Sequence, residues 1–225
     1  MLNVLVVIPA YNEEGSIGRV VASVIAAGYD YVVVNDGSTD GTAALCKENS
    51  FNYIDLPVNR GIAAAFRAGV DYALDNGFDC VVQFDGDGQH RVEYIEALTD
   101  GIRHGYDIVI GSRFVDAKKP VRLRALGSNM ISGMIKATTG ASIADPTSGM
   151  RAFGSRALAV IGEHRNLGPE PDTIAYLVRK QGMKVLEVQV EMSERISGKS
   201  YLNMRQSVFY MGRMTASILV GQFFK

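Results

Sequence analysis

Short runs rich in β-branched residues alternate with amphipathic stretches through the first half of this chain. Each run ends where polar or glycine-rich residues begin, which is the pattern of strands followed by tight loops. The runs cover residues 4–8, 31–34, 53–56, 80–84 and 108–110. Apolar side chains at helical spacing fill the intervals between them. Strands that alternate with helices are joined by crossovers, so the pattern predicts an α/β fold with a mostly parallel sheet.

The second half predicts further helices near residues 155–162 and 172–181, a strand near 184–190 and a last helix over 203–224. Helix N-caps are expected at Ser16, and at Ser38 or Asp40. On a helical wheel the last helix gathers one broad apolar face. That face consists of Met204, Val208, Met211, Ile218, Leu219 and Phe223. We therefore divide the chain into a globular unit over 1–202 and an amphipathic helix over 203–225, which packs on its own domain, a second subunit or a lipid interface.

Composition narrows the class of protein. A hydrophobic fraction of 47% and a charged fraction of 21% are typical of a folded globular domain and exclude a disordered chain. The formal net charge of -1 argues against binding nucleic acid through an overall positive field. Cys46 and Cys80 form no CxxC pair, which favours a reduced cytoplasmic protein. We expect neither a secretory signal nor a membrane-spanning segment of about 20 apolar residues.

The fourth predicted strand ends in an acidic loop, Asp85-Gly86-Asp87-Gly88-Gln89. Carboxylate and amide oxygens suit Mg²⁺ or Mn²⁺, and such ions complete their shell with phosphate oxygens. The plainer alternative is a solvated turn. An EF-hand is disfavoured because His90 stands where that loop requires glycine, and because a strand rather than a helix precedes the acids. An aspartyl phosphatase lacks its expected partner motifs.

Three motifs at predicted strand ends, taken in order, carry a resemblance to a known family. They are Ile8-Pro9-Ala10-Tyr11-Asn12-Glu13-Glu14, Val34-Asn35-Asp36-Gly37-Ser38-Thr39-Asp40-Gly41 and the acidic loop extended to His90. Together they resemble family 2 glycosyltransferases. Later motifs narrow the likeness to the branch of dolichol- and polyprenyl-phosphate glycosyltransferases. These are Gly111-Ser112-Arg113, Asp145-Pro146-Thr147-Ser148-Gly149-Met150-Arg151 and Arg195-Ile196-Ser197-Gly198-Lys199-Ser200.

The resemblance implies a GT-A fold and assigns roles to the loop residues. It places the nucleoside of a nucleotide sugar against Pro9, Ala10, Tyr11, Glu13, Val34 and Asp36. It places Asp85 and Gly86 beside the ribose or the metal shell, with Asp85, Asp87 and Gln89 as the metal ligands. Candidates for contact with phosphate are Arg113, Arg151, Arg195 and Lys199, since guanidinium groups hold phosphate oxygens by paired hydrogen bonds.

Two regions carry weaker expectations. Glu170 lies where relatives have acidic residues at the start of a helix near the acceptor. The simpler interpretation is a carboxylate at a helix N-terminus that is stabilised by the helix dipole. With Asp87, Arg113 and Arg151 it completes the candidate catalytic set. Basic residues Lys118, Lys119, Arg122 and Arg124 are either a lipid headgroup contact or a solvated loop. Relatives carry a lysine after the serine of the last motif, where this chain has Tyr201.

The resemblance implies an inverting, metal-dependent hexosyltransferase that moves a hexose from a UDP- or GDP-sugar to a polyprenyl phosphate. It would lie peripherally on the inner face of the cell membrane, with a separate transmembrane partner or a second copy as candidate partners and no nucleic acid. The alternatives are a family 2 enzyme acting on a glycan in cell-wall or surface polysaccharide synthesis, and a nucleotide-sugar-binding module without turnover. A Rossmann dehydrogenase is disfavoured because the first strand leads into Pro-Ala-Tyr-Asn-Glu instead of a glycine-rich loop.

Overall fold

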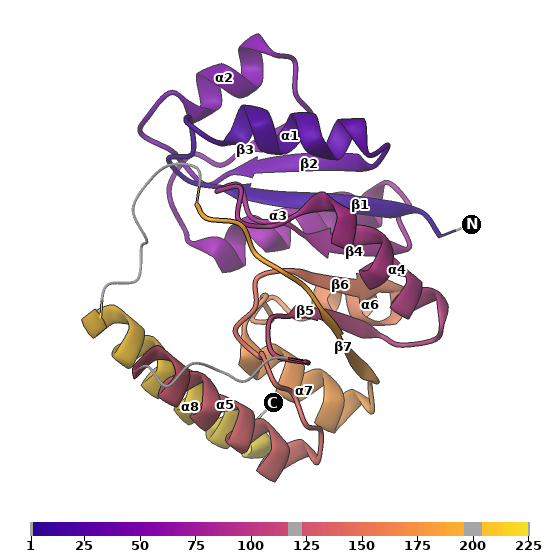
Figure 1. Cartoon of the computed structure of the whole chain (residues 1–225), viewed down its shortest axis with the longest axis vertical. Helices are drawn as coiled ribbons and strands as arrows, with labels where there is room; N and C mark the ends of the chain where they lie inside the picture. The colour runs from indigo at the N-terminus through magenta and orange to yellow at the C-terminus, as the bar shows by residue number, and fades with distance from the viewer. Residues whose placement is uncertain (1, 117–122, 196–203, 225) are drawn as a thin grey trace.

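A computed structural model describes residues 2–116, 123–195 and 204–224 and shows one sheet of seven strands with helices on both faces (Figure 1). The strands are β1 (Val4–Ala10), β2 (Asp30–Asn35), β3 (Tyr53–Asp55), β4 (Cys80–Gln83), β5 (Ile108–Ser112), β6 (Arg151–Gly154) and β7 (Val185–Gln189). The helices are α1 (Ile17–Ala26), α2 (Thr42–Glu48), α3 (Ile62–Asp75), the 3₁₀ turn η1 (Val92–Tyr94), α4 (Ile95–Arg103), α5 (Leu123–Thr139), α6 (Ser155–Glu163), α7 (Pro171–Gln181) and α8 (Met204–Phe224).

The strand order is β3-β2-β1-β4-β6-β5-β7, and all pairs are parallel except the two that β6 makes. The predicted α/β class with a mostly parallel sheet is therefore confirmed. Strand β6 was not predicted. Its four residues, Arg151-Ala152-Phe153-Gly154, contain no β-branched side chain and follow a turn-rich stretch, so local sequence gives little strand signal.

Two hydrophobic cores cover the two faces of the sheet. One contains residues of α1, α2 and α4, with Val21, Cys46 and Leu98 fully buried. The other lies under α3, α5, α6, α7 and α8, with Phe66 and Phe153 packed at 5.2 Å between ring centroids. Cys46 and Cys80 are free and buried, and burial raises the pKa of the Cys46 thiol to about 11.

Strand register brings the predicted motifs to one edge. Ala10, the last residue of β1, pairs with Asn35, the last residue of β2. Gln83 ends β4 and pairs with Arg151, the first residue of the antiparallel β6. Because β6 runs in the opposite direction, its beginning lies beside the ends of its parallel neighbours. The loops after β1, β2, β4 and β5 and the segment before β6 therefore share the edge where open α/β sheets bind ligands.

The structure differs from the two helix N-cap predictions. Ser16 holds the N-cap position of α1, but its hydroxyl donates to Glu13 Oε2 at 2.7 Å instead of capping the helix. Neither Ser38 nor Asp40 is the N-cap of α2, since Gly41 occupies that position. Asp40 accepts a hydrogen bond from Thr42 N at 3.0 Å and another from Glu14 N at 3.2 Å. Its carboxylate is therefore used to join two loops.

Helix α8 packs against both α5 and α7, with which it forms the lower layer in Figure 1. Of the predicted apolar face, Met211 and Ile218 pack against the core, whereas the side chains of Met204, Val208 and Phe223 lie outside the described residues. Met214 and Ile218 are buried, whereas Leu219 is 42% exposed and Phe209 is 76% exposed. No helix in the described ranges combines the length and apolar character needed to cross a bilayer.

Close packing of α3 on β1 gives a test of the fold. A Cβ added at Gly69 would lie 2.8 Å from Val7 Cγ2, inside a fully buried layer, whereas one added at Gly133 of α5 would meet no atom within 4 Å. We expect Gly69→Ala to destabilise the protein by about 1–3 kcal/mol through overpacking. The matched Gly133→Ala should stabilise it by about 0.5–1 kcal/mol through helix propensity. Urea unfolding of both variants checks the opposite signs, and equal effects would contradict this packing.

Candidate active site

The acidic loop after β4 holds its two aspartates in different surroundings. The Asp85 side chain is 30% exposed, while Asp87 is buried with 5% of its surface exposed. Asp85 N donates to His90 Nδ1 at 2.9 Å, and His90 Nε2 lies 3.5 Å from Asp85 Oδ2. Because Nδ1 accepts, the neutral imidazole carries its proton on Nε2, the nitrogen nearer the carboxylate. The buried His90 thus holds Asp85 in place. The sequence did not predict this role.

Two glycines let separate loops approach the acidic loop. A Cβ at Gly86 would lie 3.1 Å from Pro9 O, so the loop after β4 packs closely against the end of β1. A Cβ at Gly149 would lie 2.6 Å from Asp85 Oδ2. The segment before β6 therefore passes directly over the Asp85 carboxylate, and a side chain at position 149 would have to displace that carboxylate.

Glu13, Asp87 and Arg195 form a charged cluster over this loop. Arg195 Nη2 lies 2.9 Å from Asp87 Oδ2, and Arg195 Nη1 lies 3.8 Å from Glu13 Oε1. Burial raises the pKa of Glu13; the hydrogen bond from Ser16 and the charge of Arg195 lower it, while the charge of Asp87 raises it further. The structure thus brings together three of the predicted site residues.

Asp36 organises the loop that leads into α3. Its two carboxylate oxygens accept from Arg60 N at 2.9 Å and from Gly61 N at 2.7 Å. Gly61 has a φ of 88°, a backbone conformation that favours glycine. Asp36 is 3% exposed, so it fixes the loop before α3 at this edge of the sheet.

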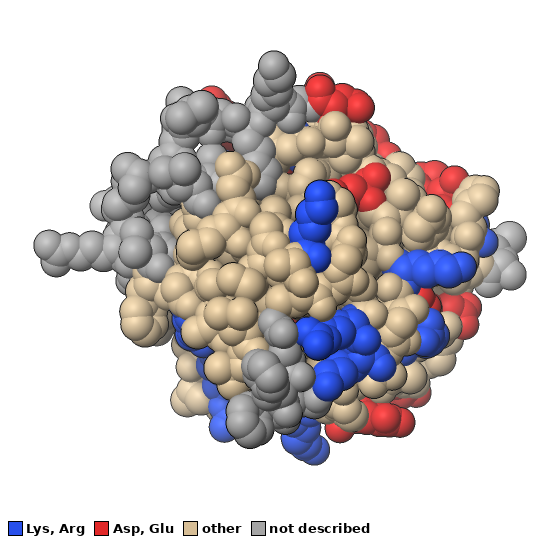
Figure 2. Space-filling view, turned by 90° about the horizontal axis from the view of Figure 1, so that it is seen from below, with Lys and Arg blue, Asp and Glu red and all other residues tan. Residues whose placement is uncertain are grey.

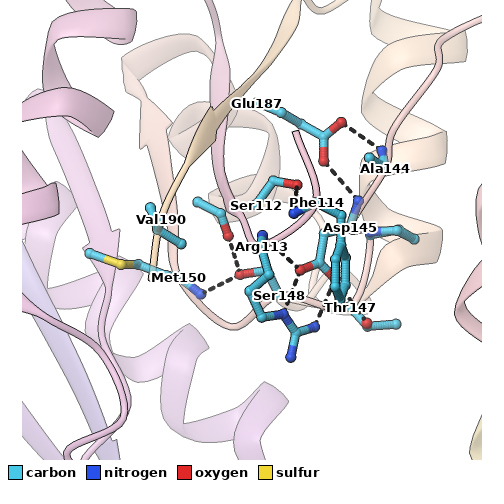
Figure 3. Close-up of polar contacts among 12 residues, drawn as sticks. Ser112, Arg113, Phe114, Ala144, Asp145, Thr147, Ser148, Met150, Glu187 and Val190 are labelled. Carbon is cyan, nitrogen blue, oxygen red and sulfur yellow. Dashed lines mark hydrogen bonds and ion pairs between the residues drawn. The ribbon is translucent and has the colours of Figure 1, made fainter. Parts of the chain in front are cut away.

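Arg113, at the end of β5, is held by Asp145 (Figure 3). Arg113 Nε and Nη2 lie 2.7 Å and 2.8 Å from the two oxygens of Asp145, which is fully buried. Glu187 of β7 accepts from Asp145 N at 2.8 Å and from Ala144 N at 2.6 Å. This bidentate pair raises the pKa of Arg113 and leaves its Nη1 as the nitrogen not used by Asp145. Asp145 belongs to a motif that we singled out, but its partner could not be read from the sequence.

Arg151 is buried and does not reach the surface of the protein. It is 2% exposed, and its guanidinium donates to Pro169 O and, at 2.6 Å, to Pro146 O. Burial lowers the pKa of Arg151 because the charged form is desolvated. The side chain therefore fixes the loops on either side of β6 and α6.

Glu170 lines a cavity of about 650 Å³ between α3, the segment before α7, and α8. Burial raises the pKa of Glu170, the charge of Asp172 adds to this, and Arg151 and Arg213 oppose it. Arg60, Arg165 and Arg213 are exposed side chains from three elements that line the same cavity. The cavity therefore offers positive groups at its rim and a half-buried carboxyl in its wall.

The remaining predicted residues fall in three groups. Pro9, Ala10 and Tyr11 lie at the carboxyl end of β1, at the predicted edge. Val34 is fully buried in the core under α3, so its side chain does not face the crevice. Lys199, the basic residues 118, 119 and 122, and Tyr201 lie outside the described residues, as does the side chain of residue 124.

The oxygen atoms of the acidic loop could supply part, but not all, of the coordination shell of a hard divalent cation. Asp85, Asp87 and Gln89 provide oxygen atoms on one loop. No cluster of three or more acidic, histidine or cysteine side chains within the described ranges could hold a metal alone. Mg²⁺ and Mn²⁺ are commonly held by one or two carboxylates with water and phosphate oxygens. The residues present therefore suit an ion that arrives with a diphosphate.

Comparisons with known proteins agree with this geometry. The model of glycosyl transferase family 2 matches residues 5–162, and the chain belongs to this family. A polyprenol monophosphomannose synthase from Mycolicibacterium smegmatis is 31% identical over 224 residues, covering 91% of this chain and 84% of that protein. An undecaprenyl-phosphate mannosyltransferase from Micrococcus luteus is 30% identical over 219 residues, covering 90% and 88%.

A solved structure supports the fold. Glucosyl-3-phosphoglycerate synthase from Mycobacterium tuberculosis, in complex with Mn²⁺, uridine diphosphate and glucosyl-3-phosphoglycerate, superposes with a TM-score of 0.70. The identity is 16%, and the match covers 98% of this chain and 80% of that one. The predicted GT-A fold and family are thereby confirmed.

The close passage of Gly149 over Asp85 can be tested directly. We expect Gly149→Ala to displace the Asp85 carboxylate and to weaken Mn²⁺-dependent binding of nucleoside diphosphate by about tenfold or more, the scale of one lost charged contact. Calorimetric titration with uridine and guanosine diphosphates measures the effect, with Gly133→Ala as the control. Unchanged affinity in a folded Gly149→Ala protein would show that Asp85 is not part of the binding site.

Proposed function

We propose that this protein transfers a hexose from a nucleoside-diphosphate sugar to a polyprenyl phosphate, with inversion at the anomeric carbon. The supporting observation is the meeting of the Glu13, Asp36 and Asp85–Gln89 loops at one sheet edge, in a family whose relatives here include two polyprenyl-phosphate mannosyltransferases by name. The donor base and the hexose are left open in this proposal.

The donor would lie across the edge formed by the loops after β1, β2 and β4. In this proposal Pro9, Ala10, Tyr11, Glu13 and Asp36 contact the nucleoside. Asp85, Asp87 and Gln89 hold Mg²⁺ or Mn²⁺ against the diphosphate. The ion would supply positive charge where negative charge grows on the leaving oxygen. The chain's own contribution is to hold Asp85 rigidly between His90 and Gly149.

A polyprenyl phosphate needs alignment more than activation. Its attacking oxygen is already anionic at neutral pH, so the reaction requires charge compensation and orientation, and no strong general base. Arg113, whose Nη1 is not used by Asp145, and Arg195 are the cations at the edge that suit phosphate oxygens. Attack from the side opposite the leaving diphosphate inverts the anomeric carbon in one step, which requires no enzyme nucleophile.

A glycan acceptor is the second candidate because of Glu170. A sugar hydroxyl is neutral and must lose a proton, so it needs a base near the reacting carbon. Glu170 is a carboxyl in the wall of a cavity, and burial raises its pKa, which makes it a better proton acceptor than an ordinary carboxylate. With a lipid phosphate the same cavity would receive the hexose and Glu170 would contact its hydroxyls.

A peripheral membrane location is part of the proposal. Met130 of α5 is 47% exposed, and α8 exposes Phe209, Leu219 and Val220 at 76%, 42% and 54%. Figure 2, which views the α5–α8 end of the molecule, shows a broad uncharged area with Lys and Arg side chains gathered along one side. Apolar side chains beside basic ones suit an anionic lipid surface.

The transfer reaction gives the main test. Radiolabelled UDP- and GDP-hexoses are incubated with undecaprenyl phosphate and Mn²⁺ or Mg²⁺, and lipid-extractable label is counted. We expect label from one donor class, lost on chelation of the metal. Asp87→Asn should reduce the rate by at least about 100-fold, as loss of a group that stabilises developing charge does. The matched Asp100→Asn, on the exposed surface of α4, should leave the rate unchanged.

Two other results would change the proposal. Label in glycan acceptors and none in lipid, with strong loss in Glu170→Gln, would establish the second candidate. Binding of nucleotide sugar without transfer to any acceptor would point to a binding module.

Membrane contact has its own measurement. Phe209→Ser should weaken co-sedimentation with phosphatidylglycerol-containing vesicles by between about fivefold and thirtyfold, since burying one aromatic side chain is worth roughly 1–2 kcal/mol. The control is Ile25→Ser, which removes a 52% exposed side chain from α1, on the other side of the sheet. Equal loss in both variants, or in neither, would contradict docking through α8.

A further inference from the structure

The segment after β7 lies across the acidic loop and carries an arginine into it. Ser193 N donates to Gln89 O at 2.9 Å, and Arg91 Nη1 lies 2.9 Å from Glu191 Oε2. These contacts join residues about 100 positions apart and fix the path of residues 191–195 over the loop. Arg195 is therefore placed at the acidic loop by backbone and side-chain contacts that do not involve its own guanidinium.

The guanidinium of Arg195 occupies the centre of a group of oxygens. Its Nη2 lies 2.9 Å from Asp87 Oδ2 and 3.5 Å from Gln89 Oε1, and its Nη1 lies 3.8 Å from Glu13 Oε1. The side chains of Glu13 and Asp87 are 9% and 7% exposed, so water screens their mutual repulsion poorly. Arg195 supplies a positive charge between the two carboxylates, which offsets their mutual repulsion.

A divalent ion at Asp87 would share this carboxylate with Arg195. Asp87 Oδ1 accepts from Gln89 N at 2.9 Å, and Asp87 Oδ2 faces Arg195 Nη2. A divalent ion bound to Asp87 and Gln89 would lie against the guanidinium, and the two positive charges would repel in this poorly screened place. Loading the ion therefore favours displacement of Arg195 from Asp87. A diphosphate that arrives with the ion offers the guanidinium new oxygen partners nearby.

We infer that Arg195 exchanges one set of partners for another. Before the divalent ion binds, its guanidinium neutralises Glu13 and Asp87, and after the ion has bound, it holds the donor diphosphate. The inference rests on the proposed function, because it takes the Asp87 loop as the site of the ion and the diphosphate. It predicts that one side chain opposes binding of the ion alone and assists binding of the ion with nucleotide.

The test is a pair of binding measurements on Arg195→Gln, without any transfer reaction. Binding of Mn²⁺ alone is followed by electron paramagnetic resonance of the free ion up to millimolar concentration. We expect Arg195→Gln to bind Mn²⁺ on the order of tenfold more tightly than the natural chain, since a competing charge is removed. With Mn²⁺ saturating, the same variant should bind uridine or guanosine diphosphate about tenfold more weakly. Arg103→Gln, which removes an exposed arginine paired with Glu96 at 2.7 Å, should change neither affinity.

Thermal unfolding gives a second readout. Without metal, Arg195→Gln leaves Glu13 and Asp87 uncompensated, so its Tm should fall, and Mn²⁺ should raise its Tm more than that of the natural chain. Mn²⁺ affinity that is unchanged or weaker in Arg195→Gln would overturn the exchange, and so would unchanged nucleotide affinity. If opposite shifts are observed while no lipid product forms in the transfer assay, the exchange stands and only the proposed acceptor fails.

Discussion

A fully buried carboxylate is the constraint on which the second half of this structure depends. Asp145 is completely shielded from water, and an ionised group in that place is tolerated only with a charged partner and a full set of hydrogen bonds. Arg113 supplies the charge, and Glu187 accepts from the successive backbone N–H groups of Ala144 and Asp145. Three segments far apart in sequence are thereby joined: the end of β5, the turn before β6, and β7. The same turn then carries Gly149 over Asp85, so the position of the acidic loop depends on the Asp145 pair.

The buried arginine of β6 extends this arrangement to the cavity. Arg151 donates to carbonyls on both the 145–150 turn and the segment before α7, and Glu170 lies at the end of that segment. The 145–150 turn, which passes over Asp85, and the cavity wall are consequently held by one guanidinium. A buried side chain can thereby set the distance between the acidic loop and Glu170.

The sequence was informative where local pattern decides structure. Alternation of strands and helices predicted the sheet, and parallel strands must end at a common edge, so the convergence of Glu13, Asp36 and Asp85 followed. The sequence was uninformative where contacts between residues far apart in the chain determine the structure. The contact between Arg195 and Gln89 spans 106 positions, and no local rule selects arginine 195 over other arginines. Strand β6 is formed by its place between β4 and β5, and Val34 points into the core because the strand alternates faces.

The antiparallel strand β6 also determines the order in which the strands can join the sheet. Strands β1 to β4 can pair using only the first 83 residues, but β5 and β7 join the sheet through β6. Until residue 154 has left the ribosome, the outer edge of β4 has unpaired peptide groups and β5 has no strand to join it to the rest. A nascent chain of this protein therefore passes through a stage with an open, apolar strand edge, the kind of surface that chaperones cover and that promotes aggregation.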